Sequence, residues 1–315
     1  MHPAASVILF TTASGAGYGV LVLSPILLAF GILPADRWLG VALLAPALCL
    51  VTAGLLASTF HLGHPERAWR ALSQWRSSWL SREGIMAIVT YGPAAAFGYA
   101  WIGLETASGG WAWTGIATAT AAAATLFTTA MIYRSLKPIP AWATDWTIAG
   151  YLILGLLTGL IVITTVSSSF GFHPVRFQWL ALALVVCAAI VKNAYWSRLA
   201  GTCRETEAMS GAAVGSDDGA ITSIEWPHTE ENYVLKEMGF RVARKHADRL
   251  RRATRNLLFV APAIVFVVMP SLLPMPYLAW IAWPGAALVL VGVVLERWLF
   301  FAEARHVVTL YYGAS

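Results

Sequence analysis

The sequence has few charged residues for its length. Charged residues make up 12% of the 315 residues, whereas hydrophobic residues make up 58%. A soluble globular domain has about a quarter of its residues charged and about half apolar. The composition therefore argues against an ordinary soluble protein and favours a chain that is surrounded by lipid.

Cysteine is also scarce, and the cysteines that are present do not have the spacing of metal ligands. The three cysteines, Cys49, Cys187 and Cys203, are far apart, and the first two lie inside apolar runs. This pattern excludes a disulfide framework and an iron–sulfur cluster held by the chain itself. We expect no metal site in this protein.

Strand-like alternation is missing, and long apolar runs are present instead. Membrane strands alternate over about 10 residues, whereas a membrane helix needs about 20 apolar residues. We predict an all-α polytopic membrane protein in which residues 1–315 form one bundle of eight transmembrane helices. The expected spans are 5–31, 38–60, 83–104, 112–134, 146–168, 177–198, 256–275 and 278–301.

The basic residues are unevenly distributed. All but three of the 21 Lys and Arg residues lie on the side that holds the N-terminus, the connections 61–82, 134–145 and 198–255, and the C-terminal end. Arg37 and Arg176 lie on the opposite side, and Lys192 falls inside a span. By the positive-inside rule, both termini and the long connections are cytoplasmic.

The connection His61–Glu83, HLGHPERAWRALSQWRSSWLSRE, is the most informative stretch. Pro65 is well suited to the first turn of a new helix. Four apolar residues then recur at spacings of three to four, which predicts an amphipathic interfacial helix over residues 66–80: Trp69, Leu72, Trp75 and Trp79. Ser81 is expected to cap the next span.

This connection places His61 and Glu83 at the same depth, one at the end of a span and one at the start of the next. An imidazole and a carboxyl group there can hydrogen-bond a quinone carbonyl and exchange its protons. In the alternative interpretation, His61 only caps a helix and Glu83 only supports the helix dipole. The residues themselves do not decide between the two.

The long connection 201–255 has two parts. Residues 201–225 are small and polar and predict a flexible linker, and a helix is expected to start near Thr229. The basic run that follows contains Arg241, Arg244 and Lys245. We interpret it as a docking surface for a soluble partner; the alternative is a segment bound to anionic lipid.

Other function classes fit less well. No histidine lies in the middle of a span, so the sequence disfavours a b-type haem, which needs two axial ligands inside the bundle. Polar groups near one boundary rather than at the midplane argue against a transporter. We expect Lys192 to extend towards the interface and Arg134 to pair with Asp145. A purely structural anchor remains an alternative.

The stretches HLGHPERAWRAL and SWLSRE, followed by YRSLKPIPAWATDW, resemble the membrane-anchor subunits of the DMSO-reductase type. The resemblance implies a molybdopterin catalytic subunit, a four-cluster iron–sulfur subunit and a quinone site in the anchor. His61 and Glu83 match the family's motif, and Trp69, Trp75 and Arg82 complete the expected quinone site. His64 is expected to contact the docked subunit. Molybdopterin and the iron–sulfur clusters would belong only to the partners.

Within this family, the segment Asn232–Arg252 and the start MHPAASVILFTT are similar to the anchors of cytoplasm-facing sulfite dehydrogenases. Together with the charge pattern, this favours sulfite oxidation, with electrons passed to ubiquinone or menaquinone in a bacterial inner membrane. The alternative is an anchor of a DMSO or other sulfur-compound reductase that oxidises quinol. No nucleic-acid partner is expected.

Overall fold

The computed structural model describes residues 5–59, 64–213 and 246–307. His61 and the predicted docking residues Arg241, Arg244 and Lys245 lie outside these ranges. The described residues form helices and connecting turns without a strand, and eight of the helical segments are long and apolar enough to cross a membrane. The prediction of an all-α polytopic membrane protein with eight spans is confirmed.

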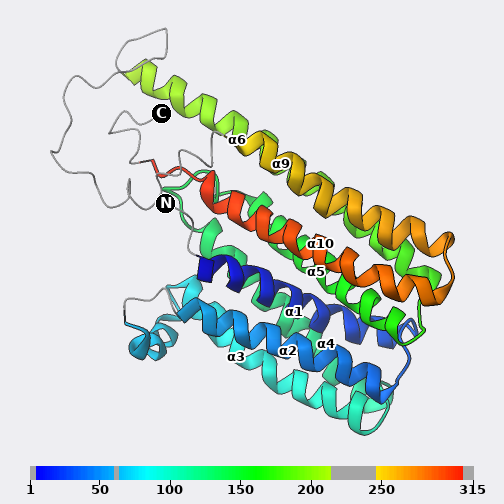
Figure 1. Ribbon diagram of the computed structural model, residues 1–315. Coiled ribbons are helices and arrows are strands. Elements are labelled where there is room, and N and C mark those ends of the chain that lie inside the picture. The colour runs from blue at the N-terminus through cyan, green and yellow to red at the C-terminus, as the bar shows by residue number, and fades with distance from the viewer. Residues whose placement is uncertain (1–4, 60–63, 214–245, 308–315) are drawn as a thin grey trace.

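The spans form an elongated bundle of roughly parallel helix axes (Figure 1). Their bounds are α1 Ala5–Ala29, α2 Arg37–Thr59, α3 Trp79–Gly98 continued by a π-helical turn to Gly103, α4 Ala112–Arg134, α5 Asp145–Ser169, α6 Val175–Ala213, a seventh span Ala247–Ser271 that starts with α9 Ala247–Arg255, and α10 Met275–Ala302.

Helices α1 and α5 form the buried centre of the bundle, and they approach each other closely through glycines. A Cβ atom added at Gly19 would overlap the carbonyl oxygen of Gly155, and one added at Gly159 would overlap the backbone of Gly19. Small residues allow such contacts between membrane helices, where van der Waals packing replaces the hydrophobic effect as the driving force. This contact brings the backbones of α1 and α5 close together at the centre of the bundle.

One end of the bundle collects the parts that the sequence analysis singled out. We call it the basic end: it is the end at which α1 begins, α10 ends and the short helix η1, Pro65–Gln74, lies (Figure 1). Arg134 at the end of α4 pairs there with Asp145 at the start of α5, at 2.8 Å, as predicted. The opposite end carries short turns between the described helices.

The interfacial helix is shorter than expected. It is a 3₁₀ helix that ends at Gln74, and Trp79 already belongs to α3. The prediction that Ser81 caps α3 is wrong, because the Ser78 hydroxyl accepts from the Ser81 backbone N–H and Ser81 is itself buried. Both serines are suitable caps by residue type, and the sequence pattern did not distinguish them.

The boundaries around the long connection also shift. Helix α6 continues to Ala213, so residues 201–213 are helical rather than part of a flexible linker. The seventh span begins at Ala247 instead of residue 256, because the basic residues Arg249–Arg255 form its first turns. A prediction from hydropathy excludes charged turns from a span, although basic side chains at a helix end can reach the interface.

Candidate functional site

Glu83 lies in the second turn of α3 at the basic end and is 5% exposed. Among the described residues, no Lys, Arg or His forms an ion pair with it. A carboxyl group in the membrane interior is costly and usually has a functional reason to be there. Glu83, which the sequence analysis singled out, is therefore a buried carboxyl group without an ion pair to another described residue.

The neutral partner of Glu83 is Thr129 on α4. The Thr129 hydroxyl lies 3.0 Å from Oε1 of Glu83 and 2.9 Å from the backbone carbonyl oxygen of Thr125. A hydroxyl carries one hydrogen, so it cannot donate fully to both acceptors. When Glu83 is protonated, the carboxyl group can donate to Thr129, which then donates to Thr125. The geometry accommodates both protonation states of Glu83.

Two tyrosines stand within electrostatic reach of Glu83, Tyr18 on α1 and Tyr133 on α4. Both are buried. Tyr133 stacks on Tyr151 of α5, with ring centroids 5.5 Å apart, and packs edge-on against Trp142. Tyr133 and Trp142 of the stretch YRSLKPIPAWATDW thus belong to one aromatic cluster.

The connection from η1 to α3 is held by Arg82 and Leu72. Arg82 donates to the backbone carbonyl oxygens of Trp75 at 2.8 Å and Arg76 at 2.7 Å. A Cβ atom added at Gly84 would lie 2.9 Å from a methyl group of Leu72, so η1 packs directly on this turn of α3. The Arg82 side chain therefore fixes the turn that precedes α3, and it forms no ion pair with Glu83.

The remaining residues of the predicted site lie on or beside η1. Trp69 is 67% exposed and Trp75 is 52% exposed. His64 is exposed, with Nδ1 3.1 Å from a carboxylate oxygen of Glu66. These positions suit contact with lipid head groups, a ligand or a partner. His61, which the sequence analysis expects at the depth of Glu83, lies outside the described residues.

A second buried polar cluster was not predicted. Lys192 of α6 and Arg297 of α10 both pair with Glu296, and all three side chains are at most 4% exposed. The expectation that Lys192 extends to the interface is wrong, because its ammonium group faces Glu296 and the rings of Tyr195 and Trp196. The Glu296 carboxylate is thus paired with two cations, and the cluster of three holds one more positive than negative charge.

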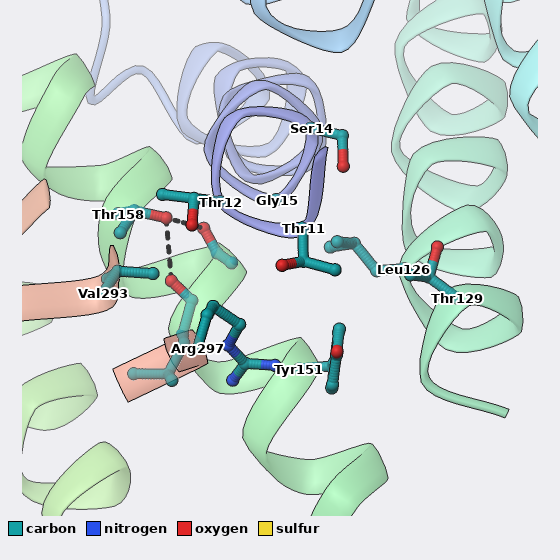
Figure 2. Close-up of a pocket in the computed structure, with 12 residues that line it drawn as sticks. Thr11, Thr12, Ser14, Gly15, Leu126, Thr129, Tyr151, Thr158, Val293 and Arg297 are labelled. Atoms are coloured by element: carbon teal, nitrogen blue, oxygen red, sulfur yellow. Dashed lines mark hydrogen bonds between the residues drawn. The ribbon is translucent and has the colours of Figure 1, made fainter. Parts of the chain in front are cut away.

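A polar cavity lies between the two clusters (Figure 2). It has a volume of about 10 Å³, which is close to what one water molecule requires. The Arg297 side chain points towards Tyr151, and its guanidinium carbon is 4.0 Å from the centre of that ring. Thr129 also lines the cavity. The hydroxyl that contacts Glu83 therefore belongs to a residue that shares a cavity with Arg297.

Beyond the end of α10, Glu303 extends this polar region towards the basic end. Its carboxylate accepts from Arg251 of α9 at 2.8 Å. Burial raises the pKa of the Glu303 carboxyl group, and the Arg251 guanidinium opposes that effect. The pair joins the first turns of the seventh span to the end of α10.

Sequence signals existed for the missed groups but were weak. Glu296 and Arg297 interrupt an apolar run, and Lys192 interrupts another, so complementary charges in two spans could have predicted their pairing. Thr129 falls on the same face of α4 as Thr118 and Thr125, at helical spacings. Only the packing of α3 on α4 reveals which threonine meets Glu83.

Comparisons with known proteins show the family to which the chain belongs. The family model of the DMSO reductase anchor subunit (DmsC) matches residues 1–313. A sulfite dehydrogenase subunit of Allochromatium vinosum is 32% identical over 329 residues, which cover 99% of this chain and 99% of that protein. No solved structure matches the chain. The protein is a multi-pass membrane anchor subunit, and it belongs to the DMSO reductase anchor subunit family.

Proposed function

We propose that the chain is the quinone-reactive anchor of a molybdenum and iron–sulfur complex that oxidises sulfite. Membership in the anchor family implies catalytic and iron–sulfur partner subunits. In our proposal the iron–sulfur partner carries four clusters, and the electrons pass from it to ubiquinone or menaquinone in the anchor. The molybdopterin centre and the clusters belong to the partners.

The observation that carries the proposal is the uncompensated carboxyl group of Glu83. It is buried at the basic end, contacts the Thr129 hydroxyl at 3.0 Å and has no cation partner among the described residues. A carboxyl group that served only to join α3 and α4 would be a costly choice in a membrane, since a neutral side chain makes the same bond. A role in proton exchange explains why a titratable group is present.

The chemistry of quinone explains what this group does. Reduction of a quinone to a quinol takes up two electrons and two protons, and the protons need a donor close to the carbonyl oxygens. Glu83 supplies a proton and is then reloaded, while His61 hydrogen-bonds a carbonyl of the ring. Trp69 and Trp75 line the access route, and the hydrogen bonds of Arg82 to the preceding turn keep η1 next to the carboxyl group.

The substrate and the side of the membrane rest on separate observations. The matched relative is named as a sulfite dehydrogenase subunit. The basic residues gather at the end that also holds Glu83, which supports our proposal that both termini lie in the cytoplasm of a bacterial cell. We propose that Arg241, Arg244 and Lys245, which lie outside the described residues, bind the iron–sulfur partner together with His64.

The test is a substitution in the complete complex. His61→Ala is expected to abolish sulfite-driven reduction of quinone. It should preserve both assembly and the reduction of an artificial acceptor that takes electrons from the soluble subunits. Unchanged quinone turnover, with an unchanged KM for quinone, would place the site elsewhere. If the purified complex also bound no quinone, the chain would be a structural anchor.

The side of the membrane is tested with a reporter fused after Ser315. A reporter that is active only in the cytoplasm should give a signal there. Activity of a reporter that works only in the periplasm would reverse the orientation. It would favour the alternative in which the anchor serves a DMSO or other sulfur-compound reductase and oxidises quinol.

A further inference from the structure

We propose that Thr129 is a positioning residue that sets the proton affinity of Glu83 by switching its single hydroxyl hydrogen between two acceptors. In one position the hydrogen points to the ionised carboxylate of Glu83. In the other it points to the backbone carbonyl oxygen of Thr125, and the protonated carboxyl group donates to the Thr129 oxygen. This inference rests on the proposed role of Glu83 in proton exchange.

The distances allow the switch without movement of the helices. The Thr129 hydroxyl oxygen is 3.0 Å from Oε1 of Glu83 and 2.9 Å from the Thr125 carbonyl oxygen, and Thr129 is 4% exposed. Both distances are those of ordinary hydrogen bonds. Rotation of one hydroxyl therefore exchanges one set of hydrogen bonds for another, and the hydroxyl keeps a partner in both protonation states of Glu83.

A purely structural role would look different. The same pair of helices is already joined one to two turns further into the bundle by the hydroxyls of Thr90 and Thr125, which lie 3.0 Å apart. That bond joins α3 and α4 with neutral groups alone. Glu83 and Thr129 repeat the linkage with a titratable group, so the second bond responds to pH and the first does not.

The other titratable or charged groups that the structure describes around Glu83 do not replace Thr129. Tyr18 of α1 and Tyr133 of α4 are within electrostatic reach. Arg82 donates to backbone carbonyl groups of the preceding turn. The charge of Arg297 on α10 is paired with Glu296 and lies across the cavity that Thr129 borders. In α2, the single charged residue is Arg37, at the opposite end.

The test is an infrared pH titration of the full chain in lipid nanodiscs. The carboxyl C=O stretching band that Glu83→Gln removes reports the protonation of Glu83 directly. Thr129→Val deletes the donor to the ionised form, so the titration midpoint should move to higher pH by about one to two units. Thr129→Ser restores the hydroxyl and should titrate close to the wild type.

Thr118→Val is the matched control. Thr118 lies on the same helix, is fully buried and donates to the backbone oxygen four residues earlier, at 2.7 Å, but does not contact Glu83. Its substitution should leave the midpoint unchanged. If Thr129→Val does not fold, Thr129→Cys offers a weaker donor at the same place and should give an intermediate midpoint.

The outcomes separate this inference from the proposed function, because the titration needs neither quinone nor partner subunits. A Thr129→Val midpoint equal to that of Thr118→Val overturns the inference, as does a Glu83 band that does not titrate. A shifted midpoint together with normal quinone turnover in Glu83→Gln would support the switch and reject Glu83 as the proton donor to quinone.

Discussion

Glu83 and Glu296 are both buried carboxyl groups near the basic end, yet their surroundings are opposite. Glu296 is paired with two cations, Lys192 and Arg297, and joins α6 to α10. Within the part of the chain that the structure describes, the partner of Glu83 is a neutral hydroxyl, that of Thr129, across the α3–α4 contact. Ion pairing holds a carboxylate in its charged form, whereas a neutral donor leaves the protonation state free to change.

The difference predicts a structural role for Glu296 and a functional role for Glu83. An ionic cluster of this kind is strongly destabilised when its one carboxylate is removed, because both cations then remain buried without a countercharge. An uncompensated carboxyl group can be neutralised at little cost to folding. We therefore expect substitutions of Glu296 to change stability and substitutions of Glu83 to change activity.

The largest effect on stability is expected for Glu296→Gln. It leaves Lys192 and Arg297 buried without a countercharge, which should cost about 3–5 kcal/mol of unfolding free energy. Thermal unfolding of the purified chain in detergent measures the change. Arg134→Gln, which breaks the exposed pair with Asp145, is the control and should cost at most about 1 kcal/mol. Equal losses in the two variants would contradict the comparison.

Arg251→Gln should give a smaller loss that depends on pH. Burial raises the pKa of Glu303 above its unfolded value, so this group stabilises the fold fully below the unfolded pKa, and the contribution is lost as pH rises through the folded pKa. Without Arg251 the ionised form is left unpaired.

The loss in Arg251→Gln should therefore be about 1–3 kcal/mol at alkaline pH and should shrink as pH falls through the Glu303 pKa. The difference in Tm between variant and wild type, followed across pH, measures it. Asp248→Asn removes the other carboxylate near Arg251, 3.7 Å away and 93% exposed, and should leave Tm unchanged. A loss that did not vary with pH would exclude Glu303 as its origin.

Glu83→Gln should have the smallest effect on stability. The amide oxygen can still accept from Thr129, so the α3–α4 contact remains, and the change in unfolding free energy should stay below about 1 kcal/mol. The same thermal unfolding assay measures it beside Glu296→Gln. A loss as large as that of Glu296→Gln would mean that Glu83 is also a structural group.

The fold could be predicted well because its signals in the sequence are long. Eight apolar runs and the positions of the basic residues defined the spans and their common end, and the structure reproduces both. The errors occurred where the signal was local. Ser78 and Ser81 are equally good caps by type, and the charged first turns of the seventh span hid its start at Ala247.

The candidate site was predicted only in part. Position and motif pointed to Glu83, which the structure shows to be buried, and its role in the site stays a prediction. Thr129 could not be identified, because the contact depends on which face of α4 packs on α3. The Lys192–Glu296–Arg297 cluster was missed for the same reason: a lone charge in a span looks the same in the sequence whether it reaches the interface or a partner.

The most direct test of the central claim is the ratio of two activities in the complete complex carrying Glu83→Gln. Sulfite-driven reduction of quinone is compared with sulfite-driven reduction of an artificial acceptor, with Thr118→Val as the matched control. We predict that quinone reduction falls by at least about 10²-fold in Glu83→Gln. The artificial acceptor rate and both rates of the control should match the wild type. Wild-type quinone reduction by a folded Glu83→Gln complex would contradict the account.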